Sequence, residues 1–240
     1  MRWNMAGTLY GVGVGPGDPE LMTVKAVKRI AECDMIGIPA KDAASCTAYN
    51  VAREAVNGLE KKPVIAVYVP MTSDTEKLMQ AYDEGSEKLL RGLREGKDIA
   101  FLNLGDPVIY GSYMELHERV LKAGGKAEII SGVPSFCAVA AALAIPLGSR
   151  KEKIHILPGL HYAQELERYD GTRILMKSGG KAAEIKEKLL NLEEGGKVKA
   201  SAVINCGMEN QVVCRDIGEL PEDAGYFTTI LVKEAKELCS

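Results

Sequence analysis

The stretch from Leu9 to Pro19 reads Leu-Tyr-Gly-Val-Gly-Val-Gly-Pro-Gly-Asp-Pro, and it decides the fold class of the chain. It begins as a short apolar strand and passes directly into a glycine-rich loop. Similar apolar segments rich in Val and Ile recur as far as residue 133, with helix-like segments between them. We expect these strands at Leu9–Gly13, Asp34–Pro39, Val64–Val69, Ile99–Leu104 and Ala127–Ile130. The alternation predicts an open α/β sheet.

One helix of this half can be delimited from the sequence. Asp74 is a natural N-cap, and Gly96 follows the expected end. Between them, one apolar stripe recurs at helical spacing and has small residues at positions 85 and 86. The stripe consists of Leu78, Met79, Tyr82, Gly85, Ser86, Leu89, Leu90 and Leu93.

The pattern changes beyond Pro134. A helix of small residues is expected at Ser135–Ala144, and a second helix at Lys181–Leu192. Because two of the last strands follow each other with no helix between them, this half is expected to form a mixed or antiparallel sheet. Its strands are expected at Ile154–Leu157, Arg173–Met176, Ala200–Asn205, Val212–Ile217 and Phe227–Val232. We therefore predict two α/β domains, 8–133 and 134–240, with a cleft between them.

Composition excludes several classes of function. The 240 residues carry 30 basic and 33 acidic side chains, so no overall basic field exists for nucleic acid or anionic lipid. The longest apolar run, from Phe136 to Leu147, is too short to span a bilayer, and the glycines after Leu9 argue against a signal peptide. The six cysteines include no Cys-x-x-Cys pair, which favours free thiols in the cytoplasm and no metal site.

The glycine-rich loop does not have the spacing of a phosphate-binding loop. A Gly-x-Gly-x-x-Gly pattern starting at Gly11 or Gly13 needs glycine at position 16 or 18, and these positions hold Pro16 and Asp18. The prolines also remove N–H donors that a pyrophosphate needs. The loop is therefore expected to approach a ligand other than a phosphate. The alternative is a tight strand–helix turn with no ligand.

Two further loops follow expected strands. Leu104-Gly105-Asp106-Pro107 comes after the fourth strand, and Gly132-Val133-Pro134-Ser135 comes after the fifth. Both lie at the carboxyl edge, where open α/β sheets bind ligands. Asp106 is expected to accept hydrogen bonds from a ligand, and the alternative is an Asx turn or a helix N-cap. Three such loops from one sheet predict a ligand site.

In combination these loops resemble the tetrapyrrole methylases, which use S-adenosylmethionine. The family's Gly-x-Gly-Pro-Gly-Asp motif matches Gly13 to Asp18, and its Gly-Asp-Pro motif matches Gly105 to Pro107. A third motif, Pro-Gly-Val-Ser-Ser, is represented by Ser131 to Ser135, with Pro134 in place of a residue that is often Ser or Thr. Within the family, Leu9–Leu21 and Asp106–Tyr113 look most like the branch that methylates C20 of precorrin-2 or cobalt-factor II.

The resemblance implies a fold of the tetrapyrrole methylase type, with the cofactor in the cleft between the domains. By position, its cofactor-binding residues are Pro16, Gly105, Asp106, Ile109, Pro134, Ser135, Met176 and Cys206. The tetrapyrrole is implied to lie against Gly13, Gly15, Gly17 and Asp18. Tyr110 is the candidate catalytic residue, for moving a proton or orienting the ring, and the alternative is an aromatic that only packs on the ligand. A homodimer is also implied.

Alternatives to C20 methylation are left open by the sequence. They are a corrin-pathway methylase of different regiochemistry, a tetrapyrrole carrier without activity, and a methylase of a protein substrate, as in diphthine synthase. The segment from Asn205 to Asn210 looks like the cobalt-containing route. Because His117, His155 and His161 are not clustered, we expect any cobalt to arrive already inside the ring.

Overall fold

The computed structural model describes residues 6–158, 163–178 and 181–235. The chain divides into an N-terminal unit that ends at Pro134 and a C-terminal unit that begins at Ser135. The domain boundary predicted from the sequence lies one residue earlier. His161 lies outside the described residues.

The N-terminal unit contains a five-stranded sheet in the order β3-β2-β4-β1-β5, and every pairing in it is parallel. Because the strands are parallel, their carboxyl ends share one edge of the sheet. The expected open α/β sheet is confirmed. The strands are β1 (Thr8–Gly13), β2 (Met35–Ile38), β3 (Val64–Ala66), β4 (Ile99–Asn103) and β5 (Lys126–Ile130).

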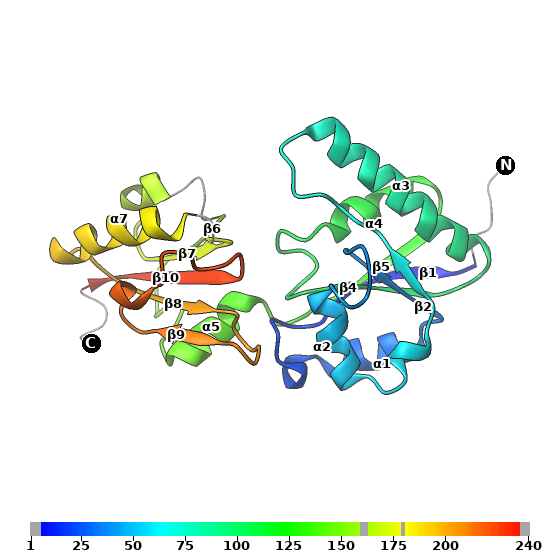
Figure 1. Ribbon diagram of the computed structural model, residues 1–240, viewed down its shortest axis with the longest axis horizontal. Helices are drawn as coiled ribbons and strands as arrows, with labels where there is room; N and C mark the ends of the chain where they lie inside the picture. Colours follow the sequence, from blue (N-terminus) through cyan, green and yellow to red (C-terminus); the bar gives the residue numbers. More distant parts are fainter. Residues whose placement is uncertain (1–5, 159–162, 179–180, 236–240) are drawn as a thin grey trace. The chain divides into compact units, whose positions relative to one another are not determined.

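Helices cover both faces of this sheet (Figure 1). Tyr10 and Val12 of β1 belong to the core beneath the first pair of helices, whereas Leu9 belongs to the core beneath the second pair. This division follows from the alternation of side chains along a strand. The first pair is α1 (Val24–Glu32) and α2 (Thr47–Ala55), and the second is α3 (Thr75–Arg94) and α4 (Tyr113–Lys122).

The expected boundaries of α3 are confirmed. The Asp74 carboxylate accepts hydrogen bonds from the backbone N–H groups of Glu76 and Lys77, at 3.1 and 3.2 Å. Gly96, in the left-handed region with a φ of 79°, follows the last turn. Most of the predicted stripe is buried, and Leu78 and Met79 are partly buried at its N-terminal end.

Gly11 of β1 lies directly beneath the ring of Tyr113 from α4. A Cβ atom at position 11 would lie 2.1 Å from the ring carbon Cε1. The ring cannot easily move aside, because Tyr113 is fully buried and its hydroxyl donates a 2.8 Å hydrogen bond to the Glu128 carbonyl. Gly11 therefore provides the room in which α4 packs on the sheet.

We expect Gly11→Ala to lower the free energy of unfolding by about 1–3 kcal/mol, because the added methyl group overpacks this contact. Urea denaturation followed by circular dichroism measures the effect. Gly92→Ala in α3 is the matched control, since its Cβ would meet only side-chain ends at 3.2 Å or more. Equal stability of the two variants would contradict the proposed packing constraint.

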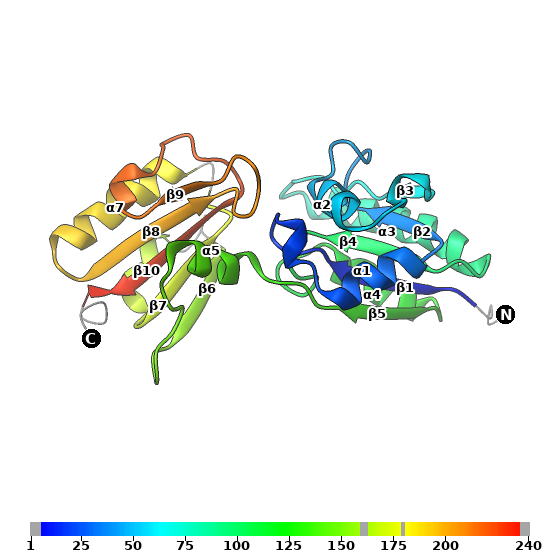
Figure 2. The same ribbon diagram turned by 90° about the horizontal axis from the view of Figure 1, so that it is seen from below.

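The C-terminal unit contains a second sheet, in the order β6-β7-β10-β8-β9. Only the β6–β7 pair is parallel, and the other pairs are antiparallel, so the expected mixed sheet is confirmed. Figure 2 shows this sheet from a second direction. Its strands are β6 (Ile154–Pro158), β7 (Thr172–Met176), β8 (Val198–Ile204), β9 (Val212–Cys214) and β10 (Thr228–Glu234).

In the described part of the C-terminal unit, two α-helices pack on this sheet. Side chains of α7 (Ala182–Glu194) share a buried core with Ala200, Ala202 and Ile230 of the sheet. The apolar helix α5 (Ser135–Leu143) contacts β8 and β10. Both helices lie close to the ranges expected from the sequence, Ser135–Ala144 and Lys181–Leu192.

Two expected strands are shorter than the sequence pattern indicates. The strand expected at Val212–Ile217 ends at Cys214, because Asp216 caps a short 3₁₀ turn at Ile217–Glu219 instead. The strand expected at Val64–Val69 ends at Ala66, four residues before Pro70, which has no N–H to donate to a sheet. At the end of β9, local turn chemistry outweighs an apolar pattern.

Candidate active site

Three loops meet at the carboxyl edge of the N-terminal sheet. They follow β1, β4 and β5, which are neighbours in the strand order, and they comprise residues 13–18, 104–111 and 131–134. We call them the glycine loop, the Asp106 loop and the Ser131 loop. The prediction that they lie together at one sheet edge is confirmed.

The glycine loop and the Asp106 loop are joined by an isolated antiparallel bridge between Gly15 and Gly105. The Gly105 N–H donates to the Gly15 carbonyl at 2.6 Å, and the Gly15 N–H donates to the Gly105 carbonyl at 3.3 Å. Both glycines are in the left-handed region, with φ of 76° and 72°. This conformation favours glycine, which explains the residue type at both positions.

At Gly132, the Ser131 loop approaches backbone atoms of the other two loops closely. A Cβ atom at Gly132 would lie 2.2 Å from the Gly105 carbonyl oxygen and 2.8 Å from Gly13 Cα. A Cβ atom at Gly13 would in turn lie 2.6 Å from the Gly132 nitrogen. Real Cβ contacts are essentially never this short, so each position requires glycine for a close approach.

Asp106 ties the Asp106 loop to the Ser131 loop. Its Oδ2 accepts hydrogen bonds from the Ser131 hydroxyl at 2.5 Å and the Gly132 N–H at 3.0 Å. Its Oδ1 accepts from the Val108 N–H at 2.9 Å, which is an Asx turn. Only 5% of the residue is exposed. The alternative Asx turn is therefore present, and the carboxylate also performs a longer-range positioning role that the sequence did not indicate.

The geometry gives the Asp106 carboxylate a role in holding the loops, and its predicted contact with the cofactor stays a prediction. Three protein donors already bind the two oxygens, and burial leaves them little access to a ligand. We therefore assign the side chain to holding the loops in place. A cofactor contact from the backbone of this loop stays a prediction.

Tyr110 lies near the end of the Asp106 loop, with 47% of the residue exposed. Its φ of 51° places a bulky residue in the left-handed region, a conformation that surrounding structure must enforce. The turn before it is closed by a 3.2 Å hydrogen bond from the Ile109 N–H to the Asp106 carbonyl. The aromatic ring is thus presented on an exposed, tightly constrained turn, and its catalytic role stays a prediction.

The rest of the glycine loop is buried at Pro16 and Gly17 and half-buried at Asp18. The Asp18 carboxylate accepts a 2.8 Å hydrogen bond from the Glu20 N–H and caps a short 3₁₀ turn, which is a structural role. The bridge to Gly105 couples the glycine loop to the Asp106 loop. A valine at Gly15 would disturb the Asp106 loop as well, so that substitution cannot separate substrate binding from cofactor binding.

In the C-terminal unit, Met176 and Cys206 come together at one edge of the sheet. Met176 ends β7 and Cys206 follows β8, and both strands pair with β10, near its first residues. Burial raises the pKa of the Cys206 thiol to about 11, so the thiol is neutral at physiological pH. Of the other predicted cofactor residues, Pro134 ends the N-terminal unit and Ser135 begins α5.

The sequence did not mark Lys177 and Ser178, which follow Met176, and it marked Asn205 only as part of the segment Asn205–Asn210. Lys177 and Asn205 both have positive φ, at 58° and 51°. Ser178 is fully buried, and its hydroxyl has no hydrogen-bond partner in the described part of the chain. Positive φ is common for asparagine and uncommon for lysine, so the conformation of Lys177 leaves no sequence signal.

The chemistry of the three loops fits S-adenosylmethionine, which carries a positively charged sulfonium. Residues 13–18, 104–111 and 131–134 contain two aspartates and no lysine or arginine. Such a neutral-to-acidic environment suits a cationic ligand and not a pyrophosphate. Within the described ranges, no three His, Cys, Asp or Glu side chains are grouped to hold a metal ion. Among the described helices, none has the length and apolar character needed to cross a membrane.

The chain thus has two α/β units. The first contains a parallel sheet that is covered by helices and has glycine-rich loops at its carboxyl edge, and the second contains a mixed sheet. The model of the Tetrapyrrole (Corrin/Porphyrin) Methylases matches residues 8–221. The chain therefore belongs to the tetrapyrrole methylase family, as its motifs predicted.

Individual members of the family show which branch this chain is similar to. The precorrin-2 C(20)-methyltransferase of Sinorhizobium sp is 30% identical, over 96% of this chain and 97% of the relative. A probable cobalt-precorrin-2 C(20)-methyltransferase of Methanocaldococcus jannaschii is 34% identical, over 71% of this chain and 72% of the relative. The fold is similar to that of uroporphyrin-III C-methyltransferase from Thermus thermophilus, complexed with S-adenosylhomocysteine. That structure has a TM-score of 0.65 and 22% identity, and the match covers 97% of this chain and 100% of that one.

Proposed function

We propose that this protein transfers a methyl group from S-adenosylmethionine to C20 of precorrin-2 or its cobalt-containing counterpart, cobalt-factor II, in cobalamin biosynthesis. The observation that carries the proposal is the cluster of three loops locked together by Asp106, in a chain that is similar over nearly its whole length to a precorrin-2 C(20)-methyltransferase.

S-adenosylmethionine, when bound, supplies a methyl group on a positively charged sulfur. The proposed contacts from the N-terminal unit are Pro16, the backbone of Gly105 and Asp106, Ile109 and Pro134. From the C-terminal unit they are Ser135, Met176 and Cys206. The chain's main contribution is alignment, because effective molarities of well-held reactants reach about 10⁵–10⁸ M. Loops fixed by backbone bridges and a buried carboxylate are suited to that task, since they need little reordering when the ligands bind.

The tetrapyrrole is proposed to lie against Gly13, Gly15, Gly17 and Asp18 of the glycine loop. An electron-rich ring carbon would form a bond to the methyl group as the methyl–sulfur bond breaks and S-adenosylhomocysteine leaves, and the same carbon would afterwards lose a proton. Tyr110 is the proposed group for guiding that proton or orienting the ring, since its exposed side chain follows the Asp106 loop. Its alternative role is to pack on the ring without proton transfer.

Calorimetric titration with S-adenosylhomocysteine separates a methylase from a carrier that only holds the tetrapyrrole. Saturable binding of one equivalent per chain supports the methylase. A folded protein that binds tetrapyrrole but not S-adenosylhomocysteine would be a carrier, and the proposed activity would be wrong.

We expect cobalt-factor II to be methylated without added metal and faster than precorrin-2. The reasons are the likeness of the segment Asn205–Asn210 to the cobalt route and the lack of a metal-ion cluster among the described residues, so that cobalt must enter inside the ring. Initial rates with equal concentrations of the two substrates test this. Equal or faster turnover of the metal-free ring would reverse the preference and leave the reaction type intact.

The proposal includes a homodimer in the cytoplasm. The dimer rests on family resemblance, and the location rests on cysteines that are free in the described part of the chain. Light scattering that gives the monomer mass of 25.9 kDa across a range of concentrations would count against the dimer.

A further inference from the structure

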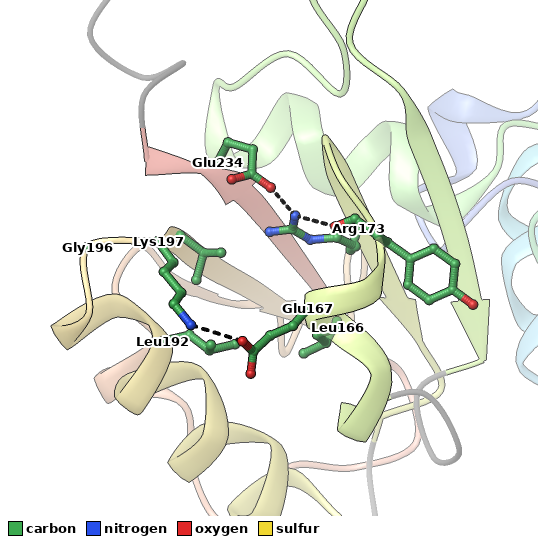
Figure 3. Close-up of a pocket in the computed structure, with 9 residues that line it drawn as sticks. Leu166, Glu167, Arg173, Leu192, Gly196, Lys197 and Glu234 are labelled. Atoms are coloured by element: carbon green, nitrogen blue, oxygen red, sulfur yellow. Dashed lines mark hydrogen bonds and ion pairs between the residues drawn. The ribbon is translucent and has the colours of Figure 1, made fainter.

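A pocket of about 550 Å³ lies within the C-terminal unit, away from Met176 and Cys206 (Figure 3). It is built where β7 and β8 begin and β10 ends, whereas Met176 and Cys206 lie at the opposite ends of β7 and β8. Its volume is in the range of small-molecule sites. The pocket is therefore separate, within this unit, from the edge assigned to the cofactor.

Arg173 is the buried charge of this pocket, with only 2% of its side chain exposed. Its Nη1 forms an ion pair with Glu234 and donates a 2.9 Å hydrogen bond to the Tyr169 carbonyl. Its Nε and Nη2 are buried without a hydrogen-bond partner among the described residues. One end of the guanidinium is thus anchored, and the remaining edge is free.

The free edge has the geometry that recognises a carboxylate. Nε–H and one N–H of Nη2 point in parallel from the same side of a guanidinium, and this pair binds two carboxylate oxygens at once. Figure 3 shows the free end of the guanidinium directed into the space bordered by Leu192, Lys197 and Glu167. Buried donors are nearly always satisfied in folded proteins, so an unsatisfied pair that faces a pocket indicates a missing acceptor.

The other charges of the pocket already have partners. Glu234 is bound to Arg173, and Glu167 accepts a 2.9 Å hydrogen bond from Lys197. That hydrogen bond holds the pKa of the Glu167 carboxyl below its ordinary value, so Glu167 stays ionised at neutral pH. Neither carboxylate reaches the free edge of Arg173 within hydrogen-bond distance.

Apolar side chains form the rest of the lining. Leu166, Leu192 and Val198 are all buried or nearly so, yet they border the pocket. A ligand that places a carboxylate on Arg173 would therefore lay an apolar body against these residues. This combination excludes a bare inorganic anion as the best-fitting occupant.

We propose that this pocket is a binding site for a small organic carboxylate, held by the Nε and Nη2 edge of Arg173 with its apolar body against Leu166, Leu192 and Val198. The site is independent of the methyl-transfer chemistry proposed above. Its test uses binding alone and does not depend on turnover.

The test is an NMR titration of the full chain with benzoate and with benzamide, its neutral match in size and shape. We expect benzoate to bind in the millimolar range, to shift the Arg173 Nε–H resonance, and to bind at least about tenfold more tightly than benzamide, which is about 1.4 kcal/mol. Inorganic phosphate is expected to bind more weakly than benzoate. Equal binding of benzoate and benzamide, or no shift of the Arg173 resonance at millimolar benzoate, would overturn the proposal.

Two variants and one control make the result specific. Arg173→Met removes the donors and should abolish benzoate binding. Should that variant fail to fold, Leu192→Trp fills the pocket and keeps the guanidinium, and it should weaken benzoate at least tenfold. Arg215→Met is the matched control, because Arg215 belongs to the same unit and does not line the pocket. Benzoate binding that survives Leu192→Trp, or that is lost in Arg215→Met, would place the ligand elsewhere.

Discussion

Gly132→Ala is expected to lower kcat/KM for methyl transfer more than any other substitution considered. The added Cβ would lie 2.2 Å from the Gly105 carbonyl oxygen and 2.8 Å from two backbone atoms of Gly13. Since none of these neighbours is a flexible side chain, the Ser131 loop must move away from both other loops. A misplacement of about 1 Å near reacting groups costs on the order of 100-fold in rate, so we expect a loss of about 100-fold or more.

Steady-state kinetics and S-adenosylhomocysteine calorimetry measure this effect together. Gly92→Ala is the control for adding a methyl group in the same unit, because it lies in α3, where alanine is favoured over glycine. The control should keep normal kinetics, and both variants should retain their circular dichroism spectra. Normal turnover in a folded Gly132→Ala variant would contradict the tight loop contact.

Asp106→Ala is the second large effect that we expect. The substitution removes the acceptor of three hydrogen bonds, from the Val108 N–H, the Ser131 hydroxyl and the Gly132 N–H. We expect S-adenosylhomocysteine binding to weaken by about 1.5–3 kcal/mol, which is the usual cost of losing hydrogen bonds to a charged group. Calorimetry measures the dissociation constant, and an unchanged value with an intact fold would refute the assignment.

Ser131→Ala distinguishes a positioning carboxylate from one that touches the cofactor. The substitution removes one donor to Asp106 and leaves the carboxylate itself in place. If Asp106 positions the loops, S-adenosylhomocysteine binding should weaken, by less than in Asp106→Ala. If the carboxylate bound the cofactor directly, removing a competing donor would leave the affinity unchanged or improve it.

The layout of the N-terminal unit could be predicted because its signals are local. Short apolar strands, the Asp74 cap and the glycine after α3 each follow from a few neighbouring residues. Once the strands are parallel, the three loops must share one edge of the sheet. The spacing around Pro16 and Asp18 likewise indicates that the glycine loop is not built for a pyrophosphate.

Features that depend on distant residues could not be predicted in this way. The hydrogen bond from Ser131 to Asp106 joins positions 25 residues apart, and the ion pair from Arg173 to Glu234 joins positions 61 apart. The one local signal of the pocket is an arginine inside the apolar strand Thr172–Met176, and its partners appear only in the folded chain. The bridge between Gly15 and Gly105 also joins residues that are distant in the sequence. Because of this bridge, a substitution in the glycine loop also disturbs the Asp106 loop.

The position of the transferred methyl group tests the central claim most directly. The purified protein is incubated with S-adenosylmethionine labelled with ¹³C in its methyl group, together with cobalt-factor II or precorrin-2, and the product is examined by NMR. We predict one labelled methyl group per ring, attached to C20. A label at any other ring carbon, or no label in a protein that binds S-adenosylhomocysteine, would contradict it.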